Sequence, residues 1–343
     1  MNNSADTSAT LPTSSLTLRV YESLPGNPMK IGIGLAILLL LIYWTGRVLF
    51  DGAGNSSFED VFVAVTQLLV LAYCVSAYAY LLKSVRETVS ALSPAAPDET
   101  AWQAASELIG RHSGWLLVIF GLVNYLVIGV FVTNITTPDP VNPWDWRSWT
   151  YDLYWHRITT VFFVGYMACF CYVLVVDSLR LSRLSETISS IDLLNLKPLH
   201  PLTRQGLTNA LLVIGMVSVL SLFAVEARYW PALVGFWLSF ILLAWIGMML
   251  PLRGIRKQIK AAREQELDWC EKRLRASRDT LKSGDGGTSS IAEVAAYRTT
   301  IESIRNWPFD HLTLTRFALY LLIPLGSWLG GAFVERGLDL VLQ

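Results

Sequence analysis

Seven long apolar runs constrain this chain more than any other feature of its sequence. Each is about 20 residues long, the length that a helix needs to cross the hydrocarbon core of a bilayer. The runs occupy residues 29–50, 58–82, 114–132, 158–176, 207–225, 231–250 and 314–334. Only 16% of the 343 residues are charged, against about a quarter in soluble domains. The sequence therefore predicts an all-α membrane protein with seven transmembrane helices.

Lysine and arginine predict how these helices are oriented. The loops after the second, fourth and sixth runs are basic, whereas the loops after the first, third and fifth are not. Because basic loops stay in the cytoplasm, we expect a cytoplasmic N-terminus and an outer C-terminus in a multi-pass protein of the inner or plasma membrane. The expected parts are a disordered cytoplasmic tail, six transmembrane helices, a soluble segment and a seventh helix, at 1–27, 28–251, 252–312 and 313–343.

The segment 252–312 is the one sizeable soluble piece, and it holds twelve lysines and arginines. Apolar residues recur at helical spacing on both sides of the glycine-rich stretch 283–289. The pattern predicts a cytoplasmic helical hairpin whose first arm extends roughly 45 Å. Its apolar stripe is a candidate face for a homo-oligomer or a cytoplasmic protein partner: Ile255, Ile259, Leu267, Leu274, Ile291, Val294, Tyr297 and Ile301.

The outer loop 134–157 is unusually aromatic, with four tryptophans in twelve residues. One interpretation is a segment that lies in the membrane interface, where tryptophan and tyrosine are favoured. The other is an outer ligand pocket, since aromatic walls with a few polar groups are typical of small-molecule sites. The candidate pocket residues are Trp144, Trp146, Trp149, Trp155, His156, Arg157, Glu226 and Arg228.

The last apolar run contains Pro324, Gly326 and Gly330. Small residues allow helices to approach closely, and proline kinks a helix. Both tight packing and a gate that bends are consistent with this pattern.

No catalytic motif is present, so we do not expect an enzyme. The four histidines are scattered over different loops, and Cys169 and Cys171 would point to different faces of one helix. We therefore expect no metal and no cofactor. A net charge of zero gives no argument for nucleic acid. The polar residues inside the runs are neutral, which favours hydrogen bonds between helices over proton pumping.

The layout of seven spans, with extended cytoplasmic helices before the last one, is similar to that of insect odorant and gustatory receptor-like channels. That resemblance implies a tetramer whose last span lines a pore. It rests on architecture alone, because the last run reads LYLLIPLGSWL and lacks the aromatic signature of that family.

Three functional hypotheses follow. The leading one is a channel or receptor-like protein that assembles, or docks a partner, through its cytoplasmic hairpin. The alternatives are a transporter of an uncharged or lipid-like solute and an accessory scaffold without transport activity.

Overall fold

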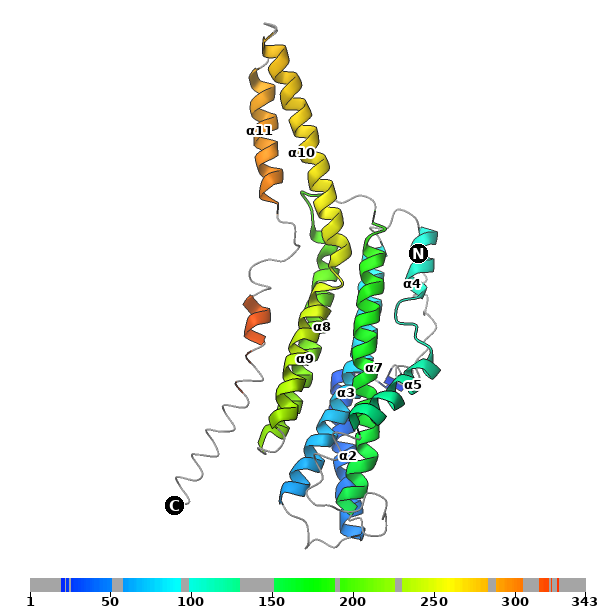
Figure 1. The fold of residues 1–343 in the computed structure, drawn as a ribbon. Coiled ribbons are helices and arrows are strands. Elements are labelled where there is room, and N and C mark those ends of the chain that lie inside the picture. The colour runs from blue at the N-terminus through cyan, green and yellow to red at the C-terminus, as the bar shows by residue number, and fades with distance from the viewer. Residues whose placement is uncertain are drawn as a thin grey trace, which may run out of the picture.

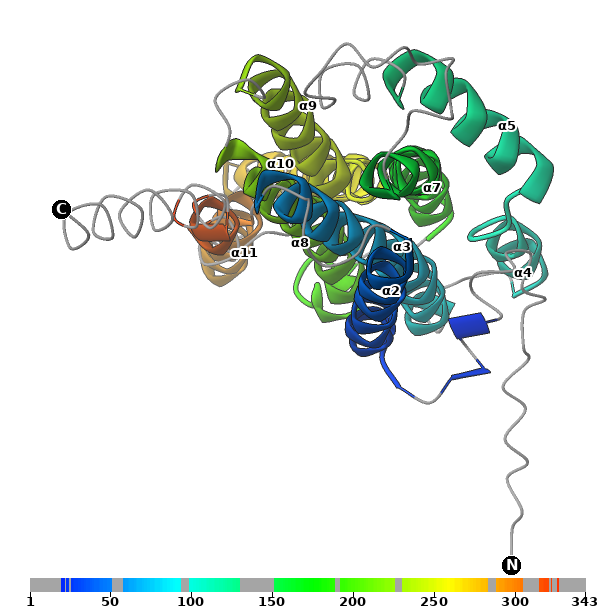
Figure 2. The ribbon, with the colours of Figure 1, turned by 90° about the horizontal axis from the view of Figure 1, so that it is seen from below.

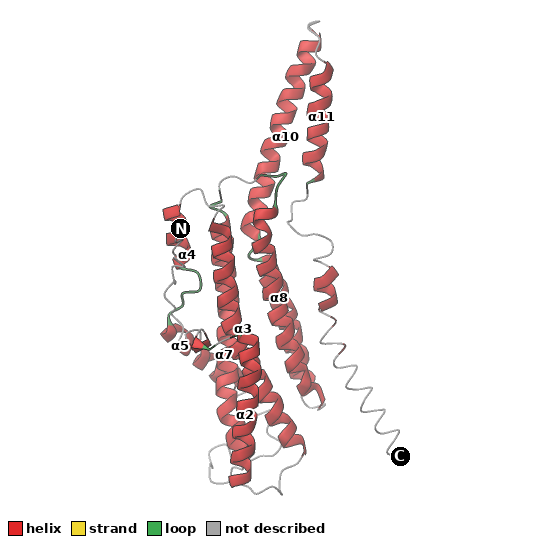
Figure 3. Ribbon diagram, turned by 180° about the vertical axis from the view of Figure 1, so that it is seen from behind, coloured by secondary structure: helices red, strands yellow, loops and turns green. Residues whose placement is uncertain are grey.

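The computed structural model contains helices and no strands among the residues that it describes (Figure 3). These residues are 20–21, 23–24, 26–50, 58–93, 99–129, 151–188, 192–225, 230–282, 288–304, 315–320, 322 and 326. The all-α class predicted from the sequence is therefore confirmed for this part of the chain.

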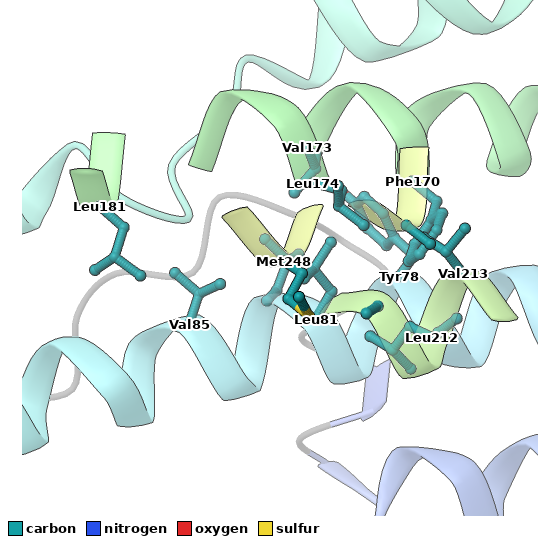
Figure 4. Packing of buried hydrophobic residues seen from close by; sticks show 14 of the residues in the cluster. Tyr78, Leu81, Val85, Phe170, Val173, Leu174, Leu181, Leu212, Val213 and Met248 are labelled. Atoms are coloured by element: carbon teal, nitrogen blue, oxygen red, sulfur yellow. The ribbon is translucent and has the colours of Figure 1, made fainter. Parts of the chain in front are cut away.

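Five long helices form the central bundle (Figure 1): α2 (Pro28–Phe50), α3 (Phe58–Leu92), α7 (Tyr151–Ser185), α8 (His200–Leu220) and α9 (Trp230–Met249). Proline occupies the first turn of α2 and of α8, where its missing N–H has no partner to lose. The bundle buries one continuous apolar cluster, whose middle layer brings together Tyr78, Phe170, Leu212 and Met248 from four different helices (Figure 4).

Four of these helices are long and apolar enough to cross a membrane, namely α2, α3, α7 and α8 together with its flanking turns. A fifth crossing is possible where α9 continues, after a 44° bend, into α10 (Arg253–Lys282). The structure thus confirms a helical protein with four or five apolar helices of membrane-spanning length. The predicted seventh span, 314–334, lies mostly outside the described residues.

The predicted third span is shorter than a full crossing. It consists of α5 (Gly114–Asn124) followed by a π-helical turn, η2 (Tyr125–Gly129). The helix packs against α7 but lies across the bundle rather than along it (Figure 2). Most of its large side chains are exposed, including Trp115 at 74% and Leu126 at 67%.

Side-chain contacts show in which direction α3, α7 and α8 run relative to one another. Gln67 of α3 contacts Thr160 of α7, and Tyr78 lies against Tyr166, so residue numbers rise together and the two helices are parallel. Between α3 and α8 the numbers run in opposite directions, since Cys74 contacts Met216 and Ser84 contacts Gln205. The chain between α3 and α7 therefore returns from one end of the bundle to the other.

The helices α3 and α7 have 35 residues each, which corresponds to roughly 50 Å. This is longer than the hydrocarbon core of a bilayer requires. The apolar pattern of the run 158–176 continues through Leu179, Leu181 and Leu184, and α7 accordingly extends to Ser185. The short helix α4 (Glu99–Glu107) follows α3, with Trp102 and Ile109 buried as the sequence pattern suggests.

The segment 252–312 forms α10 and α11 (Thr288–Ser303), which lie side by side and extend beyond the bundle (Figure 1). We refer to them below as the helix pair. Ile255, Ile259 and Ile301 of this pair belong to the same buried cluster as the bundle core. The helix pair is thus joined to the bundle by packing as well as by the chain.

Candidate functional site

The predicted outer pocket is only partly described. Trp144, Trp146, Trp149, Glu226 and Arg228 lie outside the described residues, whereas Trp155, His156 and Arg157 lie in the second turn of α7.

The three described residues do not share one surface. Trp155 packs against the rings of Tyr43 and Tyr151, with centroids 5.5 and 6.2 Å away. Arg157 is partly buried, and His156 points into the bundle, where 8% of it is exposed.

A small polar layer surrounds His156. Gln67 donates through its Nε2 to the Thr160 hydroxyl at 2.6 Å and to the His156 carbonyl at 3.2 Å. The Gln67 Oε1 atom is therefore the acceptor for His156 Nδ1, 2.8 Å away, so Nδ1 carries a proton. These groups satisfy one another between α3 and α7, which fits the predicted role of neutral polar residues in joining helices.

A second polar layer lies nearer the helix pair and is centred on Gln205 of α8. Its Oε1 accepts hydrogen bonds from Ser84 at 2.7 Å and Thr88 at 3.0 Å, both on α3. Its Nε2 donates to Asn209, 2.7 Å away. Asn209 in turn donates to Ser178 of α7 at 3.0 Å and to the Gly247 carbonyl of α9 at 3.1 Å. One connected network thus joins four helices.

Asp177 of α7 forms a third polar site, next to this network. Its carboxylate is 1% exposed and lies 3.0 Å from His112 Nε2. It also accepts the Gly110 N–H at 3.3 Å, which the positive φ of that glycine (71°) makes possible. Arg180 contacts the same carboxylate at 3.3 Å and donates to the Leu108 carbonyl at 2.7 Å. The site fastens the turn after α4 to α7.

Sequence reasoning did not single out Asp177 as a site, although the helical continuation of the apolar run 158–176 places this residue on a helix. The available signal was a carboxylate directly after that run. Its partners could not be predicted, since His112 is 65 positions away in the sequence.

Two glycines allow close backbone contacts, one between α8 and α9 within the bundle and one between α10 and α7 at the base of the helix pair. A Cβ on Gly206 of α8 would lie 2.5 Å from the Met248 carbonyl oxygen of α9, and a Cβ on Gly254 of α10 would overlap the Ser182 carbonyl of α7. The Gly254 N–H donates to the Ser182 hydroxyl at 3.0 Å. The base of α10 is therefore fixed by backbone contacts that only glycine permits.

Specific contacts also hold α11 on α10. Arg263 of α10 donates to two carbonyl oxygens in the last turn of α11, those of Ile301 at 3.2 Å and Glu302 at 2.7 Å. These are groups that a helix end otherwise leaves unpaired. Trp269 and Tyr297 meet edge to face with centroids 6.2 Å apart, and the Tyr297 hydroxyl contacts Glu266 at 3.2 Å.

The thiol of Cys270 is buried between the two helices. Burial, followed by the nearby Glu266 carboxylate, raises the pKa of Cys270 above its ordinary value. The thiol is therefore protonated at neutral pH, which lowers its reactivity.

Part of the predicted assembly stripe belongs to the core cluster of the bundle, and the rest is partly exposed. Ile255, Ile259 and Ile301 are completely buried, so a partner cannot reach them while the helices stay packed. The remaining residues are partly exposed: Leu267, Leu274, Ile291, Val294 and Tyr297. Any partner therefore meets the edges of this stripe rather than its centre.

The predicted gate is described at one position only. Gly326 is exposed, and Pro324 and Gly330 lie outside the described residues.

Among the described residues, no three histidine, cysteine or acidic side chains are grouped so that they could hold a metal ion. Comparison of the chain with protein-family models, curated proteins and solved structures finds no match.

Proposed function

We propose that this chain is a multi-pass membrane protein that holds the helix pair in the cytoplasm as a docking arm for a protein partner. The observation that carries the proposal is the construction of the arm. It is a long helix pair, fastened at its base and tied along its length, that extends beyond an apolar bundle (Figure 1).

The surface of the bundle supports a membrane location. Large apolar side chains of α2 are exposed along its length, including Ile33 at 64%, Leu41 at 61% and Leu49 at 75%. An aqueous surface rarely carries so continuous an apolar patch, whereas lipid chains would cover it without cost.

The proposed topology has seven crossings, with the N-terminus in the cytoplasm and the C-terminus outside. The parallel course of α3 and α7 supports a crossing between them, because two parallel spans need an odd number of crossings in the intervening chain. The one long apolar run there is 114–132; because α5 lies across the bundle (Figure 2), the proposed crossing requires this run to turn along the bundle in a bilayer.

The basic residues support the side on which the arm lies. Seven lysines and arginines gather where α3, α7 and α8 meet the base of the arm: Lys83, Arg86, Arg111, Arg180, Arg183, Lys197 and Arg204. The described helix ends on the opposite side carry Arg47 and Arg157. The positive-inside rule therefore places the arm in the cytoplasm.

The base of the arm supports mechanical coupling to the bundle. Gly254 contacts Ser182, and one turn later Lys257 forms an ion pair with Glu186 at 3.0 Å. The α10 helix has 30 residues in all, or roughly 45 Å. A partner on the arm would thus be held at a fixed direction from α7.

Photo-crosslinking in native membranes tests the docking arm. We expect a photoreactive amino acid at exposed positions of the pair, such as Ala292 or Asp268, to give discrete adducts with one protein. The same group at Leu41 of α2 is the control and should react with lipid. Arm positions that give no protein adduct, in membranes where the chain is correctly inserted, would contradict the proposal.

A further inference from the structure

A shallow groove runs along one side of the helix pair. It is lined by Gln265, Glu266 and Trp269 of α10 and by Glu293, Val294 and Tyr297 of α11. Trp269 is 52% exposed, although it is the largest side chain in the groove. Its ring meets that of Tyr297 at 89°, with centroids 6.2 Å apart, while about half of the side chain stays open to solvent.

The charge of the groove is opposite to that of the helix on which it lies. The α10 helix carries ten lysines and arginines against five acidic residues. None of the six lining residues is basic, and two of them, Glu266 and Glu293, are carboxylates. The Tyr297 hydroxyl donates to one oxygen of Glu266, so that carboxylate is oriented beside the aromatic rings.

This combination has a definite chemical preference. A guanidinium or ammonium group is attracted to the face of a tryptophan ring, and more strongly when carboxylates lie beside it. The neighbouring Val294 offers apolar contact to the methylene stem of such a side chain. An anionic ligand would be repelled by both carboxylates, and a purely apolar ligand would remove water from them without replacing it.

We propose that this groove binds an arginine- or lysine-bearing segment of a partner protein, with the cation over Trp269 and between Glu266 and Glu293. The inference rests on the proposed docking arm and names the chemistry of its partner. The excess of basic residues on α10, ten against five acidic ones, adds specificity, because the net charge of that helix repels a cationic segment that the groove attracts.

A second copy of the chain fits the groove less well. Two copies in one membrane that are related by a two-fold axis have parallel arms, so the same surface of each arm meets at the same height. Groove against groove would then place Glu266 and Glu293 opposite the same carboxylates. Such like-charge contacts disfavour the pair.

The test uses the full-length protein in nanodiscs and a fluorescent alanine-based helical peptide that bears three arginines. Binding is followed by the anisotropy of the peptide. We expect measurable binding of this peptide and none of matched peptides with three citrullines or three glutamates.

Variants of the groove locate the site. The double variant Glu266→Gln, Glu293→Gln should weaken binding roughly tenfold or more, and Trp269→Ala severalfold, whereas Trp269→Phe should retain most of it. The matched control is Glu271→Gln, Asp279→Asn, which also removes two negative charges from the helix pair, but outside the groove. Circular dichroism checks that each variant keeps its helices.

Three outcomes would overturn the inference. The first is equal weakening by the control variant, which means nonspecific attraction. The second is no binding of the arginine peptide, and the third is a self-association of the free protein that Trp269→Ala abolishes. Each leaves the docking arm intact if crosslinks from Ala292 or Asp268 still reach a partner, so failure of the groove and failure of the arm are distinguishable.

Discussion

At the scale of single residues, Asp177 shows how a buried charge becomes stable at the end of an apolar helix. Its carboxylate is 1% exposed and has three separate partners: a backbone N–H, a histidine and an arginine. A buried carboxylate with hydrogen bonds and an opposite charge is tolerated, but the removal of one member of such a set leaves the others without compensation.

Replacing Asp177 by alanine should therefore lower the stability of the protein by on the order of 3 kcal/mol. We expect a lower midpoint of thermal unfolding in detergent, with Asp177→Asn intermediate because the amide keeps one acceptor. Asp268→Ala removes an exposed carboxylate and serves as the control. Equal midpoints for Asp177→Ala and this control would show that the site contributes nothing to the fold.

At the scale of elements, the interface of α8 with α9 depends on the absence of a side chain at Gly206. A Cβ there would meet a backbone oxygen, which cannot rotate away as a side chain can. Membrane helices commonly use small residues in this way to approach closely.

We expect Gly206→Val to disrupt the packing of α8 against α9 and to cost several kcal/mol, the range of overpacked cores. Gly235→Val is the matched control, because nothing lies within 4 Å of a Cβ at that position of α9. The comparison uses the yield of monodisperse protein and its thermal midpoint. A Gly206 variant as stable as the Gly235 variant would contradict the close contact.

The end of α11 depends on a single arginine of α10. Arg263→Ala should leave the carbonyls of Ile301 and Glu302 without this donor, so the last turn of α11 should fray. Hydrogen exchange should rise by roughly tenfold over 297–304, as expected for the loss of about 1.4 kcal/mol. Arg273→Ala, on the exposed surface of α10, should leave exchange there unchanged.

At the scale of the whole molecule, the polar groups occur in layers. The cluster of Gln67 and His156 lies toward one end of the bundle, and the network of Gln205 with the site of Asp177 lies toward the helix pair. Tyr78, Phe170 and Leu212 of the apolar cluster lie between them along α3, α7 and α8. This arrangement fits a bilayer whose hydrocarbon core surrounds the apolar layer, with the two polar layers toward the aqueous sides.

The proposed topology predicts that Ser148 and Ser277 are accessible from opposite sides of the membrane. In a variant without its four native cysteines, a cysteine at Ser277 of α10 should react with an impermeant maleimide only from the cytoplasmic side. A cysteine at Ser148 in the outer loop should react only from outside. Labelling of both positions from the same side would rule out three crossings between them, in the runs 158–176, 207–225 and 231–250.

A docking arm does not require a path through the membrane. Liposomes that contain the protein should therefore release ions and small uncharged solutes no faster than empty liposomes. Faster release would favour the channel or the transporter that the sequence also allows.

The helical class and the positions of most helices could be predicted from composition and periodicity, because a bilayer imposes a simple length requirement on apolar helices. The helical class, the extension of α7 past its apolar run and the short helix α4 all follow from such local patterns. The surroundings of the predicted site residues did not follow from local patterns. His156 was expected beside an outer pocket, yet its ring faces Gln67, because the direction of a side chain depends on which helix packs beside it.

What the sequence by itself determined is where helices form and which of them are apolar, since both depend on residues within a few turns of each other. Only the tertiary structure decided that Asp177 meets His112, that the ring of His156 faces Gln67, and that Ile255, Ile259 and Ile301 of 252–312 are buried. These features depend on contacts between residues tens of positions apart. Their pairing is selected by packing among all helices at once, which no local pattern encodes.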